Sequence, residues 1–178
     1  MRILFLSQRV PYPPNRGDKI LTWRAVERMK RAHSVDVLAF AHGDDDRAAA
    51  RELDAKGIPT LAVPYHHKRA LVRSLPMLLR GEPMTLGVYG SSTIRREVDR
   101  RVRDVDLVFA CSSAMGAFML DLDSVARVLH MAELDSDKWK QYAAKKSGLE
   151  RWVYEREYET LYAFEQRLAR VVEENILC

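Results

Sequence analysis

Two short clusters of polar residues have types and spacings that could do chemistry, and the first is Arg16-Gly17-Asp18-Lys19. It follows an apolar run at residues 3–6 and a stiff loop with three prolines. A strand, a loop and a helix start form many α/β ligand sites, because the helix start offers unpaired N–H groups and glycine lets a ligand approach the backbone. Asp18 is therefore a candidate catalytic group, and Arg16, Gly17 and Lys19 are candidate substrate contacts. The alternative is structural: Asp18 caps the helix, Gly17 forms a turn and the cations are solvated.

The second cluster follows an apolar run at residues 126–131 and contains Asp135, Ser136, Lys138 and Trp139. Ligands of open α/β sheets bind outside the carboxyl ends of the strands. Asp135 is a candidate catalytic group that could orient a ligand hydroxyl or act as a base. Ser136, Lys138 and Trp139 are candidate substrate contacts. Here too a structural role is open, with Asp135 capping the next helix and Trp139 packing in the core.

Three further residues come just after strand-like runs and could line the same cleft. They are Arg9, Ser112 and Ser113. For the two serines, capping of a short helix is the favoured role.

Strand-like apolar runs alternate with amphipathic helical stretches over most of the chain, which predicts a parallel sheet with helices on both faces. The expected strands are Ile3–Ser7, Ser34–Phe40, Pro59–Pro64, Asp106–Cys111 and Ala126–Met131. The expected helices are Lys19–Arg31, Asp45–Lys56, His67–Leu79 and Thr93–Arg103, with a short one at 113–120.

After the last of these strands the pattern changes to one long helix over residues 147–174, about 40 Å in length. Ser147 and Glu150 have the spacing of a capping box at its start. We therefore expect an α/β domain over residues 1–146 and a long helix within residues 147–178.

Composition narrows the function classes. The 178 residues carry a net charge of +4, which suits an anionic partner without specifying one. We expect no nucleic-acid binding, because no zinc-finger spacing or RNA-binding strand is present, and no metal, because the histidines lack ligand spacing. Two cysteines make no disulfide framework, and no apolar run is long enough to span a bilayer, so a cytoplasmic protein is expected. A single glycine in the first loop is a poor match to a dinucleotide-binding fingerprint.

Three segments resemble the N-terminal domain of GT-B glycosyltransferases of the family 4 type, in particular sugar transferases associated with exosortase and exopolysaccharide gene clusters. They are residues 11–19 (PYPPNRGDK), residues 133–143 (ELDSDKWKQYA) and residues 152–157 (WVYERE). The second resembles an Asp-x-Asp-Ser-x-Lys-Trp segment, with Glu133 in place of its first Asp.

The resemblance implies one Rossmann-like half of a two-domain enzyme. The complete enzyme would transfer a sugar from a nucleotide-sugar donor to a glycan or lipid-linked acceptor in polysaccharide biosynthesis. This chain would be the acceptor half, truncated and inactive alone, because the donor binds mainly to the missing C-terminal domain. No bound cofactor is expected. The surface that the second domain normally covers could support self-association.

A different class of function stays open, a non-catalytic α/β binding or assembly module whose long helix pairs with a partner chain. The helix at 67–79 also has two readings. Its basic and apolar residues could contact an anionic membrane, which would place the protein peripherally at the inner membrane face. The favoured alternative is a solvated helix with its apolar face in the core.

Overall fold

The computed structural model describes residues 1–177 as an alternating α/β chain, so Cys178 lies outside the described residues. Its strands are β1 (Arg2–Ser7), β2 (Ser34–Ala41), β3 (Thr60–Pro64), β4 (Leu107–Cys111), β5 (Ala126–Met131) and β6 (Glu174–Leu177). Its helices are α1 (Gly17–Lys30), α2 (Asp44–Ala55), α3 (His67–Arg80), α4 (Met84–Tyr89), α5 (Ser92–Arg101), α6 (Ser113–Gly116), α7 (Asp135–Ala143) and α8 (Gly148–Val171). Two 3-10 turns, η1 (Val102–Asp104) and η2 (Ala117–Met119), follow α5 and α6.

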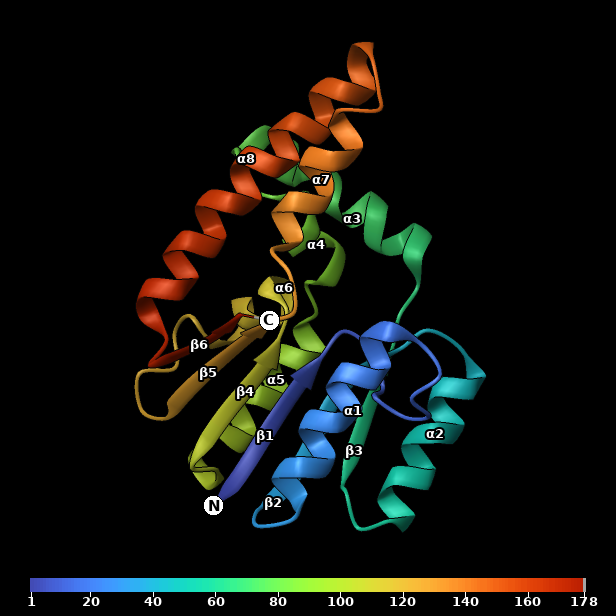
Figure 1. The fold of residues 1–178 in the computed structure, drawn as a ribbon, viewed down its shortest axis with the longest axis vertical. Helices are drawn as coiled ribbons and strands as arrows, with labels where there is room; N and C mark the ends of the chain where they lie inside the picture. The colour runs from blue at the N-terminus through green and yellow to red at the C-terminus, as the bar shows by residue number, and fades with distance from the viewer. Residues whose placement is uncertain (178) are drawn as a thin grey trace.

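The strands form one parallel sheet in the order β3-β2-β1-β4-β5-β6. The chain starts in the middle of the sheet, moves outward to β3, and then crosses to β4 on the other side of β1 (Figure 1). This is the Rossmann-like arrangement, with a topological switch point between β1 and β4. The predicted fold class is confirmed.

Each face of the sheet is covered by helices, because alternate side chains of a strand point to opposite faces. Ile3 and Phe5 of β1 pack with residues of α1 and α2, whereas Leu4 and Leu6 pack with residues of α5, α6 and α8. All four side chains are at most 2% exposed. The central strand β1 therefore carries apolar side chains toward both faces, as the sequence pattern indicates.

Helix α8 crosses one face and places charged side chains at the ends of three other helices. The Glu157 carboxylate accepts the backbone N–H groups of Met84 (2.7 Å) and Thr85 (2.8 Å) at the start of α4. Arg156 donates to three backbone carbonyls at the end of α3, those of residues 77, 78 and 82. Glu165 accepts the N–H and hydroxyl of Ser136 at the start of α7.

The C-terminal region differs from the expected single helix over 147–174. Helix α8 ends at Val171, and Glu174–Leu177 form β6, which pairs with β5. Helix periodicity misses this strand because β6 is only four residues long and exposed. The division at residue 146 stays a prediction, although α8 and β6 pack on the sheet built by the earlier residues.

Two capping interpretations at helix starts are also wrong, and one helix was not predicted. Ser147 is the N-cap residue of α8 but makes no side-chain capping bond, while Glu150 pairs with Lys146 instead. Asp18 lies inside the first turn of α1, after the N-cap residue Arg16, so it does not cap the helix through its side chain. Helix α4 was not expected at all. Among residues 1–177, no helix is long and apolar enough to cross a membrane.

The cap at α4 leads to a stability prediction. Glu157→Gln leaves one acceptor oxygen for two N–H groups, so we expect the free energy of unfolding to fall by about 1–3 kcal/mol. Urea denaturation followed by circular dichroism measures it. Glu159→Gln, an exposed position on the same helix, is the matched control and should stay within about 0.5 kcal/mol. Equal effects of the two substitutions would contradict the capping role.

Candidate functional site

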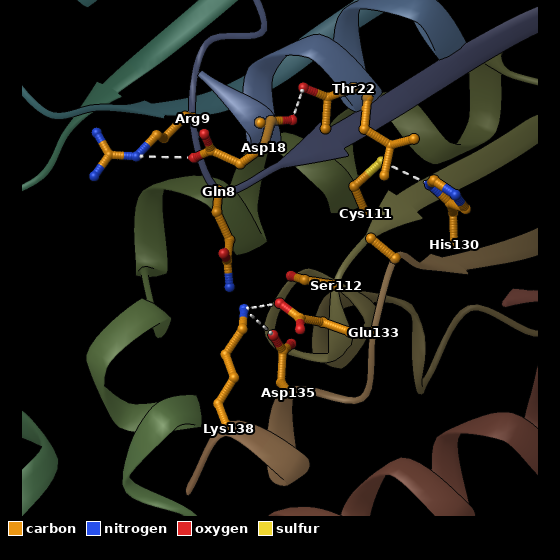
Figure 2. A pocket seen from close by; sticks show the side chains of 13 residues that line it. Gln8, Arg9, Asp18, Thr22, Cys111, Ser112, His130, Glu133, Asp135 and Lys138 are labelled. Atoms are coloured by element: carbon orange, nitrogen blue, oxygen red, sulfur yellow. Dashed lines mark hydrogen bonds and ion pairs between the residues drawn. The ribbon is translucent and has the colours of Figure 1, made fainter. Parts of the chain in front are cut away.

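A cavity of about 360 Å³ opens at the carboxyl edge of the sheet, at the switch point between β1 and β4. Its walls come from the loop after β1, the start of α1, and the residues that follow β4 and β5 (Figure 2). Among its polar lining residues are Gln8, Arg9, Asp18, Ser112, Glu133, Asp135 and Lys138. We call it the polar cavity. It brings together residues from both sequence clusters.

Asp135 is held in the polar cavity by three contacts. Its Oδ2 accepts the backbone N–H of Ser113 at 3.1 Å and the Ser113 hydroxyl at 2.7 Å. Its Oδ1 lies 3.8 Å from the Lys138 ammonium, which also pairs with Glu133 at 2.7 Å. Burial alone would lower the pKa of Lys138, but Glu133 and Asp135 raise it, so the ammonium stays charged. The Oδ1 atom of Asp135 is thus left to interact with the Lys138 ammonium and with a ligand in the polar cavity.

Asp18 lies on the opposite wall, between two arginines. Its carboxylate is 3.4 Å from Arg9 Nε and 3.3 Å from Arg16 Nε, and its side chain is half exposed. Gly17 also lines the cavity, and a Cβ atom added there would meet no protein atom within 4 Å. The glycine therefore widens the cavity at the start of α1, whereas Arg16 does not line it.

Lys19 faces away from the polar cavity. Its ammonium forms a buried ion pair with Asp46 at 2.7 Å and reaches the Tyr12 carbonyl at 3.4 Å. Asp46 also accepts the N–H of His42. Burial would raise the pKa of Asp46, but the bonds from Lys19 and His42 outweigh it and lower that pKa. The pair ties α1 to the start of α2, so the structure gives Lys19 a structural partner where the sequence indicated a substrate contact.

Ser136 is likewise buried, with its hydroxyl donating to Glu165 at 2.6 Å. Its neighbour Trp139 lines a second cavity of about 710 Å³ that shares Gln8, Arg9, Asp135 and Lys138 with the first. We call this the aromatic cavity. The two candidate contacts therefore separate: Trp139 reaches ligand space and Ser136 fixes the start of α7.

Two groups of rings line the aromatic cavity. On one side Tyr65 stacks on Tyr89 with centroids 5.6 Å apart, and His42 lies 4.3 Å from Tyr65. On the other side Trp139 packs against Tyr154 at 5.4 Å. Burial, reinforced by Tyr65, raises the pKa of Tyr89 to about 12, and burial lowers the pKa of His42. The Tyr89 and His42 rings are therefore neutral around pH 7.

Cys111 and His130 form the floor of the polar cavity, with Sγ and Nδ1 3.8 Å apart. Burial raises the pKa of the Cys111 thiol and lowers that of the His130 imidazole. A protonated thiol is a poor nucleophile. Within residues 1–177, no group of three or more His, Cys, Asp or Glu side chains could hold a metal ion.

The start of α1 is a poor site for a dinucleotide diphosphate. The loop after β1 covers residues 8–16 and contains no glycine, and the first turn of α1 carries the Asp18 carboxylate. A carboxylate at a helix start repels a second anion there and uses the favourable end of the helix dipole. The cavity instead alternates carboxylates, cations, an amide and a hydroxyl. Such a mixture of donors and acceptors suits a ligand rich in hydroxyl groups.

Several residues of the two cavities were not found from the sequence. Gln8 follows β1 directly, so its position at the strand end was the available signal. His42 and Tyr65 similarly follow β2 and β3. Tyr89 gave no local signal, and Tyr154 lies in the segment 152–157 without having been singled out as a site residue.

Comparison with protein-family profiles and with curated protein sequences finds no match. Among solved structures, the fold is similar to the FolM alternative dihydrofolate reductase 1 from Brucella canis, complexed with NADP, at 11% sequence identity and a TM-score of 0.40. The match covers 98% of this chain and 91% of that chain. A similarity at this level carries no information about ligand or reaction.

The backbone at Ser112 gives a prediction about strain at the cavity wall. Its φ of 90° and ψ of 156° lie in a region that glycine alone occupies freely. Ser112→Gly should therefore raise the free energy of unfolding by about 1 kcal/mol, the strain relieved minus the added chain entropy. Ser112→Ala keeps the strain and loses the long capping contact to Met115, so it should be neutral or destabilising. Thermal and urea unfolding test both, and a less stable glycine variant would contradict the strain.

Glu165 gives a pH prediction. Burial, and secondarily Asp135, raise its pKa above the ordinary 4.5, although Ser136 opposes them. The folded protein then keeps a proton that the unfolded chain releases, so the contribution of Glu165 to stability is fully present below pH 4.5 and is lost as the pH rises through the folded pKa. Each unit of elevation corresponds to about 1.4 kcal/mol. Glu165→Gln does not titrate there, so urea midpoints should shift in favour of the variant between pH 4 and pH 8. A pH-independent difference would contradict this.

Proposed function

We propose that this chain is the acceptor-binding N-terminal domain of a GT-B glycosyltransferase of the family 4 type. The observation that carries the proposal is the pair of joined cavities at the carboxyl edge of the sheet. One presents carboxylates, an amide and an ammonium, and the other presents aromatic rings. All three sequence segments that carry the resemblance contribute residues to them.

The polar cavity offers hydrogen-bond donors and acceptors that suit the hydroxyl groups of a sugar. Asp135 and Asp18 offer acceptor oxygens, Lys138 and Arg9 offer donors, and Gln8 offers both. Each charged group has a partner of opposite charge, so the site binds a neutral polyol without leaving a buried charge unpaired. In this proposal Asp135 orients the acceptor hydroxyl that attacks the donor sugar, and Asp18 positions the acceptor from the opposite wall.

The aromatic cavity offers aromatic side chains that suit the apolar parts of the acceptor. A pyranose ring has a C–H face that packs on flat aromatic side chains, and Tyr89 and Trp139 are among the aromatic residues that line this cavity. A lipid-linked acceptor would place its apolar portion in the same space. The nucleotide-sugar donor of the complete enzyme binds a C-terminal domain in this proposal, and that domain would stabilise the departing diphosphate.

The assembly-module alternative depends on α8 pairing with a partner chain. Leu161, Phe164 and Leu168 of its apolar stripe are buried in the core of this chain, whereas Leu149 and Trp152 at its start are exposed. The buried part of the stripe is not available to a partner helix, and the joined cavities favour the glycosyltransferase proposal.

Isothermal titration of the chain with acceptor oligosaccharides and with nucleotide-sugars tests the proposal. Acceptor binding with no or weak nucleotide-sugar binding supports it. Tight nucleotide-sugar binding would contradict the assignment of this domain to the acceptor. Absence of binding to either class would favour the assembly module.

Gln8 provides a variant that separates binding from folding. Its side chain enters the polar cavity between the walls that carry Asp18 and Asp135 (Figure 2). Gln8→Ala should weaken acceptor binding about 5- to 30-fold, the equivalent of one or two lost hydrogen bonds, with little change in the unfolding midpoint. Gln141→Ala, at an exposed position on α7, is the matched control. Equal affinities of the two variants would remove Gln8 from the site.

A further inference from the structure

Helix α3 exposes the residues that the sequence pattern placed in the core. Leu71 is 45% exposed, Leu75 50% and Leu79 94%, and Val72 is 67% exposed. The buried residues of the helix are instead Ala70 and Ser74. A row of exposed apolar side chains lowers the solubility of a protein unless a partner or a membrane covers it.

Helix α3 turns its leucines outward, opposite to the expected orientation, because of its contact with α4. A Cβ atom added to Gly87 would lie 2.8 Å from both Cα and Cβ of Ser74, so the two helices approach at their small residues. Arg73 reaches the carbonyls of Gly87 and Val88 at 3.4 Å. Small residues and an arginine therefore hold α3 to the domain, and its leucines point outward.

The charge on α3 has one sign. Residues 67–80 contain no acidic side chain, and Lys68, Arg69 and Arg80 are exposed. Among residues 1–177, none of these three forms an ion pair. An apolar row flanked by unpaired cations is the pattern of a helix that lies in the interface of an anionic bilayer.

The turn between α7 and α8 presents a second surface with exposed apolar and aromatic side chains. The two helices extend beyond the sheet as an antiparallel pair (Figure 1). Leu149 is 76% exposed, Trp152 55% and Tyr142 50%. Lys145 and Lys146 lie in the turn, and Lys146 pairs with Glu150. Tryptophan and tyrosine favour the headgroup region of membranes. Leu71 of α3 and Tyr142 of α7 both line the aromatic cavity, so the two surfaces flank its mouth.

We propose that α3 and the α7–α8 turn dock this domain on an anionic phospholipid surface, with the mouth of the aromatic cavity facing the lipid. The helices lie on the membrane and do not span it, since no helix among the described residues is suited to crossing. Docking would deliver an acceptor anchored in the bilayer to the cavity. The docking step itself does not depend on the proposed glycosyltransferase function.

Vesicle sedimentation with the full chain tests the docking. We expect binding to vesicles of phosphatidylglycerol and phosphatidylcholine in equal amounts, weak binding to pure phosphatidylcholine, and loss of binding in 0.5 M salt. Binding of soluble acceptor oligosaccharides in the absence of lipid should not change with the docking variants. Failure of the docking proposal is thereby distinguishable from failure of the proposed function.

Variants at the two surfaces should weaken vesicle partitioning. Lys68→Gln and Arg69→Gln should each reduce it about fivefold, the value for one cation near an anionic surface. Leu79→Ser and Trp152→Ser should each reduce it about tenfold through lost apolar burial. All four positions are exposed, so circular dichroism and unfolding midpoints should be unchanged.

Matched controls lie elsewhere on the surface. Arg96→Gln and Arg103→Gln remove the same charge, and Ile20→Ser removes an apolar group that is 38% exposed. Equal loss of partitioning in the controls and in the α3 variants would overturn the proposal, as would absence of binding to anionic vesicles. If Leu79→Ser converts a dimer to a monomer while vesicles bind neither form, the surface contacts a second copy and the proposal is wrong.

Discussion

The arrangement of the helices above the sheet depends on charged side chains of α8 that satisfy the ends of other helices. Glu157 binds two N–H groups at the start of α4, Arg156 binds carbonyls at the end of α3, and Glu165 binds the start of α7. Burying a carboxylate is costly unless hydrogen bonds compensate it, so these side chains favour one relative position of the helices. Those helices contribute walls of the aromatic cavity, and α8 lines it as well, so the contacts of α8 determine the shape of the cavity.

The parts of the fold that could be predicted from the sequence are those with local signals. Five of the six strands can be recognised in the sequence as largely apolar runs. A strand that is covered on both faces favours apolar side chains along its length. The contacts of α8 have no such signal, since Glu157 and Thr85 are separated by 72 residues and Arg156 and Met77 by 79. The short strand β6 is exposed, so it lacks the apolar run that identifies the others.

The sequence predicted where the candidate site lies, but it did not predict all of the residues that line it. Ligands bind beyond the carboxyl ends of parallel strands, and this rule predicted that Asp18, Asp135 and Lys138 lie close together. In the structure all three line one cavity. The rule could not separate Lys138 from Lys19, because the partner of Lys19 is Asp46, which enters from α2 and is only visible once the helices are packed. The orientation of α3 was mistaken for a related reason. Its leucines have the spacing of a core-facing stripe, yet serine and alanine make the contact.

The close approach of Ser74 and Gly87 gives the chain a way to adjust which ligands it accepts. The distance between α3 and α4 is fixed by these two small residues, and both helices contribute side chains to the aromatic cavity. A larger residue at either position would push α3 outward and widen the cavity, while the polar cavity on the sheet edge would keep its geometry. Selection for bulkier or slimmer ligands can therefore act on a helix contact that the ligand never touches.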